Sequence, residues 1–141
     1  MNTSGTRIMA VDYGTVRVGI ALSDERHVLA TPFRTIINKS GLFDEILKIA
    51  TQNNVEKIIV GLPLKEDGSD SHMTKQVRTF AEKLSDKVKL SVELYDERYS
   101  SLLAQDSMIE SGKKKKDRGK KGELDKRAAA ILLQEYLDGS R

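Results

Sequence analysis

The fold is decided by the stretch IMAVDYG, residues 8–14. Its first four residues form a continuous apolar run of strand length, which is typical of a strand buried on both faces in the middle of a sheet. Asp12 follows where this strand should leave the core, and Gly14 allows the backbone to turn sharply two residues later. An isolated Asp-x-Gly is equally compatible with a turn in which the aspartate bonds its own backbone. Asp12 becomes a candidate site residue only if other carboxylates meet it.

Two further strands are expected directly after this one. Residues 17–22 alternate bulky apolar side chains at 18, 20 and 22 with small ones at 19 and 21, so one face is thin enough for a helix to approach closely. A third extended segment runs from about Val28 to Ile37, and its Pro32 indicates an edge strand or a bulge. Because the connections are short, the three strands are predicted to form an antiparallel meander.

The remaining chain alternates helical and extended patterns. The expected elements are a helix beginning at Ser40, a short buried strand at 58–60, a helix around 73–84, a strand from Val88 to Tyr95, a helix from Ser100 or Ser101 to Gly112, and a last helix from about Glu123 to Asp138. This order predicts an α/β fold with a mixed five-stranded sheet. The sheet would combine the three-strand antiparallel meander with two parallel strands and carry helices on both faces. Residues 1–141 are expected to form a single domain.

The composition excludes several kinds of protein. The chain has no cysteine, so a disulfide framework, a thiolate metal site and a cysteine nucleophile are excluded. The N-terminus lacks the basic and long apolar regions of a signal peptide, and no run of about 18 apolar residues occurs. We therefore expect a cytoplasmic protein with no membrane partner.

The basic charge is concentrated in one segment, residues 113–121. This segment carries seven basic residues and one acid, a net charge of +6, which leaves −3 for the remainder of a chain whose formal net charge is +3. Clustered lysine and arginine interrupted by glycine is typical of an anion-binding segment, and a nucleic-acid backbone is the commonest such partner. The alternative is a solvated turn that only aids solubility. The candidate nucleic-acid-binding residues are Arg98, Lys113, Lys114, Lys115, Lys116, Arg118, Lys120 and Lys121.

Carboxylates from three separate elements are expected to converge. Asp125 lies one helical turn before the apolar stripe of the last helix, and Asp96 and Glu97 end the fifth strand. If the first and fifth strands run parallel, these acids and Asp12 leave the sheet at its carboxyl edge, where open α/β sheets place their sites. Strand parity leaves open which member of the Asp96-Glu97 pair faces the site. An Asp125 that points to solvent and favours the helix dipole is the alternative.

Such a cluster has a definite chemistry. Oxygen ligands without cysteine or suitably spaced histidine select hard cations such as Mg²⁺ or Mn²⁺. Two such ions about 4 Å apart are the standard means of hydrolysing a phosphodiester bond in line. The sequence therefore indicates a two-metal nuclease acting on nucleic acid. An actin-like or sugar-kinase-like nucleotide site is a second interpretation of Asp-x-Gly-Thr, but those ATPases close two domains around the nucleotide, and 141 residues supply one.

Four spaced motifs resemble the YqgF/RuvX family over nearly the whole chain. They are Val11-Asp12-Tyr13-Gly14 with Arg17, Gly19 and Ala21; Gly61-Leu62-Pro63 with Asp67-Gly68-Ser69; Asp96-Glu97-Arg98 with Ser100-Ser101; and Asp125 with Ala128-Ala129, Leu132-Leu133-Gln134 and Tyr136-Leu137. The resemblance implies an RNase H-like fold, kinship to RuvC-type Holliday junction resolvases, and a cytoplasmic nuclease for the 5′ end of pre-16S rRNA.

The resemblance also implies site residues. The family's catalytic and metal-binding acids fall on Asp12, Glu97 and Asp125, which favours Glu97 over Asp96. Serines stand at 100 and 101 where threonine is common, and three acids are clear where related RuvC-type sites usually carry four. The family leaves two substrates open, an rRNA precursor or branched DNA, and a non-catalytic nucleic-acid-binding factor is a third possibility. A monomer would suit rRNA trimming and a homodimer would suit symmetric cutting of a junction.

Overall fold

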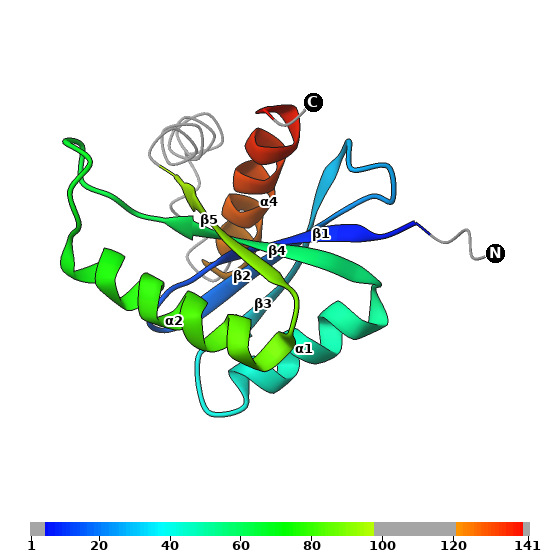
Figure 1. Ribbon diagram of the computed structural model, residues 1–141, viewed down its shortest axis with the longest axis horizontal. Coiled ribbons are helices and arrows are strands. Elements are labelled where there is room, and N and C mark those ends of the chain that lie inside the picture. Colours follow the sequence, from blue (N-terminus) through cyan, green and yellow to red (C-terminus); the bar gives the residue numbers. More distant parts are fainter. Residues whose placement is uncertain (1–4, 98–120, 140–141) are drawn as a thin grey trace.

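The computed structural model describes residues 5–97 and 121–139 (Figure 1). The helix predicted between Ser100 and Gly112, Arg98 and the basic residues 113–120 lie outside the described residues. Lys121 is the first residue of the last helix, but its side chain is not described.

The described residues build one mixed five-stranded sheet in the order β3-β2-β1-β4-β5. Strands β1 (Arg7–Asp12), β2 (Arg17–Ser23) and β3 (Ala30–Ile37) form an antiparallel meander. Strands β4 (Val55–Leu62) and β5 (Ser91–Asp96) run parallel to β1. The predicted fold class is confirmed, and the carboxyl ends of β1, β4 and β5 share one edge of the sheet.

Helices cover both faces of this sheet (Figure 1). Helices α1 (Leu42–Gln52) and α2 (His72–Val88) pack on one face, and α4 (Lys121–Gly139) packs on the other. The central strand β1 is buried on both sides because its side chains alternate. Met9 and Val11 belong to the core under α1 and α2, whereas Ile8 and Ala10 belong to the core under α4.

Helix α4 lies close to the face of β2 that carries small side chains, which confirms the expectation from the sequence. A Cβ atom on Gly19 would collide with the backbone of Asp125 in α4. About one turn further along α4, Ala129 is fully buried in the same core as Ala21. The absence of bulky side chains on both sides of this contact therefore sets how near the first turns of α4 come to the sheet.

Element ends differ from the sequence predictions where two periodicities overlap. Val88 has both the helical spacing from Leu84 and the strand alternation with Leu90, and the structure makes it the last residue of α2. Lys89 then ends the helix in the left-handed conformation, with φ 58°.

Helix α1 begins after Gly41, which has φ 95°, and no side chain caps it, so the predicted start at Ser40 is wrong.

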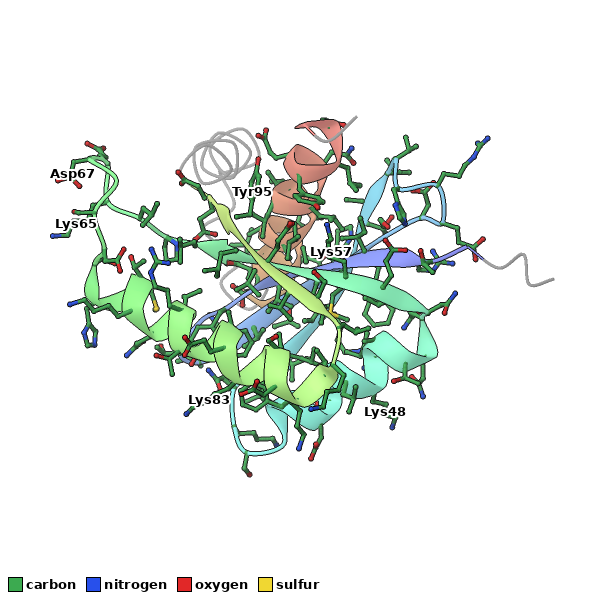
Figure 2. All side chains as sticks on the ribbon, in the orientation of Figure 1. Lys48, Lys57, Lys65, Asp67, Lys83 and Tyr95 are labelled. Carbon is green, nitrogen blue, oxygen red and sulfur yellow. The ribbon has the colours of Figure 1, made fainter. Side chains whose placement is uncertain are left out.

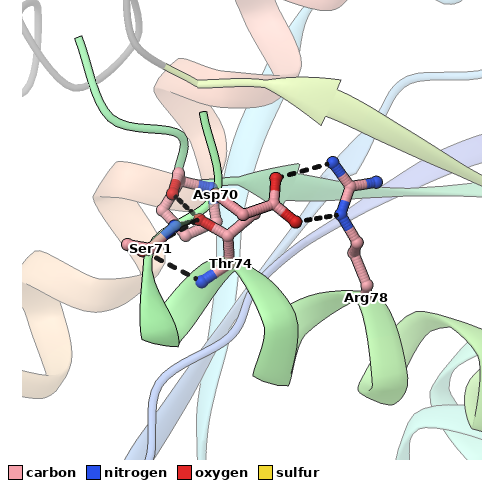
Figure 3. Close-up of polar contacts among 5 residues, drawn as sticks. Asp70, Ser71, Thr74 and Arg78 are labelled. Carbon is pink, nitrogen blue, oxygen red and sulfur yellow. Dashed lines mark hydrogen bonds and ion pairs between the residues drawn. The ribbon is translucent and has the colours of Figure 1, made fainter. Parts of the chain in front are cut away.

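The loop between β4 and α2 is fastened to the first turn of the helix (Figure 3). Ser71 and Thr74 cap each other reciprocally, and the buried Thr74 hydroxyl also donates to the carbonyl of Pro63. Arg78 donates two hydrogen bonds of 3.1 Å to Asp70. The bond from Thr74 to Pro63 ties the start of α2 to the end of β4, whereas the Asp70–Arg78 pair lies within the loop and α2.

Replacement of Gly19 by alanine tests the contact between α4 and β2. Because the added Cβ meets the backbone of Asp125, Gly19→Ala should lower the free energy of unfolding by about 1 to 3 kcal/mol. Gly139→Ala, at the open end of α4, is the matched control, since nothing lies within 4 Å of its Cβ position. Urea denaturation measures both. Equal stability of the two variants would show that the helix can move away from β2 without cost.

Candidate active site

Asp12 is the central acid of the candidate site. It is the last residue of β1, pairs with Gly19 in the sheet register, and shares the side-chain parity of Ala10, which faces α4. Burial, and then the negative charge of Asp125, raise the pKa of Asp12 to about 6. This carboxyl group therefore lies in a partly dry environment that already contains like charge.

Glu97 is the second acid near Asp12, and it comes from the end of β5, which β4 separates from β1 in the sheet. It directly follows β5, and its backbone N–H donates to the carbonyl of Leu62 at 3.2 Å. Its side chain lies over Gly61 of β4, where any Cβ atom would collide with Oε1. Burial, then the charge of Asp12, then that of Asp96 raise the pKa of Glu97 to about 7.

Asp125 is held by an arginine that the sequence analysis did not assign to the site. Arg17 Nε donates to Asp125 Oδ2 at 2.6 Å, and the two side chains are 32% and 29% exposed. Asp125 therefore faces β2 rather than open solvent, and its charge still reaches Asp12. The sequence did contain a signal for this role of Arg17. Arg17 is the single basic residue of the predicted strand 17–22, whose other residues are small or apolar, and it follows shortly after the Asp-x-Gly turn.

Glu97 and Asp125 both lie near Asp12, but the three acids do not form a completed metal-binding group. Asp12 interacts electrostatically with both Glu97 and Asp125. Within residues 5–97 and 121–139, however, no three His, Cys, Asp or Glu side chains are arranged so that they could hold a metal ion. The chemistry of the donors fits a hard cation, because carboxylates with raised pKa values need positive charge to remain ionised together. The assignment of the three acids as ligands stays a prediction, as does that of the basic residues.

The raised pKa values predict a pH-dependent stability in metal-free protein. Between about pH 4 and 7 the folded protein binds protons at Asp12 and Glu97 that the unfolded chain has already lost, so stability should fall as pH rises through this window. Asp12→Asn removes one of these groups. It should therefore gain stability relative to the parent protein between pH 5 and pH 8, on the order of 2 to 3 kcal/mol.

Urea denaturation with a chelator present, at a series of pH values, measures this difference. Asp44→Asn is the matched control, because Asp44 is an exposed acid of α1 paired with Lys87 at 3.1 Å. A stability difference for Asp12→Asn that does not change with pH would contradict the buried, like-charged environment.

Comparison with known proteins places this geometry in a family. The family model described as "RuvX: Holliday junction resolvase" matches residues 6–139. A protein of Maridesulfovibrio salexigens named "Putative pre-16S rRNA nuclease" is 40% identical over 133 residues, covering 93% of this chain and 97% of the relative. A protein of Bacteroides fragilis with the same name is 39% identical over 137 residues, covering 96% and 99%.

Solved structures show the same fold at low sequence identity. RuvC of T. thermophilus in complex with a Holliday junction substrate has a TM-score of 0.57 at 11% identity, covering 96% of this chain and 95% of that chain. The Holliday junction resolvase of fowlpox virus has a TM-score of 0.53 at 14% identity, covering 95% and 99%. No helix in the described part of the chain is long and apolar enough to cross a membrane. With one family model spanning nearly all of its length and relatives near 40% identity, the chain belongs to the RuvX family.

Proposed function

We propose that this protein is a metal-dependent nuclease that hydrolyses phosphodiester bonds of structured nucleic acid. The observation that carries the proposal is the position of Asp12, half-buried at the carboxyl end of the central strand. The charge of Asp125 helps to raise the pKa of Asp12, and the charge of Asp12 helps to raise the pKa of Glu97. Such a concentration of acid is costly unless a cation neutralises it. The chain is proposed to act as a single domain in the cytoplasm.

Asp12, Glu97 and Asp125 would hold Mg²⁺ or Mn²⁺ through their carboxylate oxygens. The chemistry that a bound divalent ion supplies is activation of water and neutralisation of charge on the phosphate. Hydrolysis adds one water across the ester: the water oxygen bonds to phosphorus, the phosphorus–oxygen ester bond breaks, and the leaving oxygen takes a proton. Gly61 gives the Glu97 side chain room at the sheet edge, and Arg17 holds one carboxylate oxygen of Asp125 in an ion pair.

The proposed substrate is the 5′ end of pre-16S rRNA, in line with the names of the relatives. The second candidate is branched DNA, which is favoured by the description of the family model and by the likeness to RuvC. The two substrates place different demands on assembly, because symmetric cutting of a four-way junction suits a homodimer. Sedimentation at cleavage concentrations therefore complements a cleavage assay.

Asp12→Asn tests the catalytic proposal. It keeps the size of the side chain but removes the charge that would bind a cation, so cleavage should fall at least about 100-fold while nucleic-acid binding remains. A matched panel of a pre-16S rRNA 5′ leader and a four-way DNA junction, each with Mg²⁺, Mn²⁺ or chelator, measures the rate and the substrate preference. Asp44→Asn serves again as the surface control. Cleavage that survives in Asp12→Asn would place the activity elsewhere, and binding without cleavage under any metal would favour the non-catalytic interpretation.

Arg17→Gln tests whether the ion pair with Asp125 competes with the cation. Loss of this partly exposed pair should lower the free energy of unfolding by at most about 1 kcal/mol in chelator. Mg²⁺ should then raise the melting temperature more in Arg17→Gln than in the parent protein, because an oxygen of Asp125 is released and a nearby positive charge is gone.

Arg78→Gln is the matched control for this comparison. It removes an arginine–aspartate pair of similar exposure at the start of α2 (Figure 3). Its thermal shift with Mg²⁺ should equal that of the parent protein. The same Mg²⁺ shift in both arginine variants would show that the Arg17 pair does not affect the cation site.

A further inference from the structure

A cavity of about 590 Å³ lies beside the candidate active site and is not used by the proposed mechanism. It is open to solvent and is lined by the turn after β1, the segment that leads into α1, the start of α1, and α2. This volume is in the range of sites for small organic molecules. The cavity is on the face of the sheet that α1 and α2 cover, opposite to α4.

Three aromatic rings form one wall of the cavity. Tyr13 and Phe80 have ring centroids 4.4 Å apart, and Phe43 and Phe80 are nearly parallel at 5.5 Å. Phe80 is buried, whereas Tyr13 and Phe43 are only partly buried and retain exposed surface at the cavity. Rings of this kind offer a flat apolar surface on which a nucleobase can stack.

The rest of the lining suits an anion. Lys39, in the segment before α1, and Lys83, on α2, are both lining residues, and none of the lining residues in the described part of the chain is acidic. Figure 2 shows Lys83 on α2 beside the segment that precedes α1, and Lys48 toward the far end of α1.

The cavity is joined to the candidate active site through consecutive residues of β1 and its turn. Asp12 faces α4, whereas Tyr13 reaches over the edge of the sheet and packs on Phe80 under α2. Asn38 holds the turn after β1 against the segment that precedes α1, since its side chain donates to the Gly14 carbonyl at 2.7 Å and its backbone N–H donates to the Val16 carbonyl at 2.9 Å. A strand of nucleic acid that crosses this edge of the sheet would meet both.

We propose that the cavity binds one unpaired nucleotide of the strand that the enzyme cleaves. Its base would stack against Tyr13 and Phe43, and its phosphate would lie between Lys39 and Lys83. A single unpaired base can turn into such a pocket, whereas a base held in a duplex cannot expose its ring face. The inference rests on the proposed function, because it assigns part of the substrate to a second position next to the same carboxylates.

Nuclear magnetic resonance tests the cavity without metal and without cleavage. AMP, UMP and inorganic phosphate are titrated separately into ¹⁵N-labelled protein with chelator, and the backbone amides of Phe43 and Thr79 report on the cavity. The mononucleotides should shift these signals and bind more tightly than phosphate, because phosphate cannot stack. Lys83→Ala should weaken mononucleotide binding about three- to fivefold, whereas Lys48→Ala, outside the cavity, should not.

A variant that fills the cavity extends the test to longer ligands. Thr79 is an exposed lining residue of α2, so Thr79→Trp should block the space and weaken binding of a single-stranded oligonucleotide at least about fivefold. Thr51→Trp, at an exposed position of α1 outside the lining, is the control. Fluorescence anisotropy measures both affinities, and circular dichroism checks that both variants fold.

The outcomes separate this inference from the proposed function. Amide shifts by mononucleotides together with weakened binding in Thr79→Trp support the cavity site even if no metal gives cleavage. Unshifted amides, equal affinity for phosphate and mononucleotides, or unchanged binding in Thr79→Trp would overturn it, even if metal-dependent cleavage is found.

Discussion

The close contact between α4 and the small residues of β2 is the constraint on which the site depends. Arg17 and Asp125 are 108 positions apart in the sequence, and only this packing brings them together. Gly19 leaves no side chain between β2 and the backbone of Asp125, so the helix lies near enough for its first acid to act on Asp12. A larger residue at 19 would move the helix outward and weaken every electrostatic interaction that joins α4 to the carboxyl end of β1.

The site that results is electrostatically unfavourable without a cation. Burial and the charge of Asp125 raise the pKa of Asp12 to about 6, and burial and the charges of Asp12 and Asp96 raise the pKa of Glu97 to about 7. Both carboxyl groups therefore ionise at a higher pH than ordinary acids do. Arg17 compensates only Asp125, the acid furthest along the chain. Local instability of this kind is expected where a site must bind charge, because a fully neutralised cluster would have little affinity for an added ion.

Sequence patterns were sufficient to predict the order of strands and helices in the fold. They were insufficient to predict which side chains from distant segments contact each other. Apolar runs and alternation identified the strands of the sheet, and the position of Pro32 anticipated both the edge strand β3 and the bulge opposite Ile20 and Ala21. The Arg17–Asp125 pair joins side chains from distant segments, which no local period records. The end of α2 at Val88 was missed because one residue satisfied both the helical and the strand spacing. The cavity was not predicted because it arises from the packing of α2 over a turn and a helix start.

Alternation along a strand explains how one short segment serves two surfaces. A strand in the middle of a sheet places successive side chains on opposite faces, so its last residues act on the two helical layers in turn. In this chain Asp12 adds negative charge on the side of α4, and Tyr13 adds an aromatic surface on the side of α2 where Lys39 and Lys83 lie. Charge of opposite sign is thereby separated across a single sheet edge. Under the proposed function, a polyanion meeting this edge would be attracted to the lysine side and repelled by the acids until a cation neutralised them, so its orientation would depend on whether the carboxylates hold a cation.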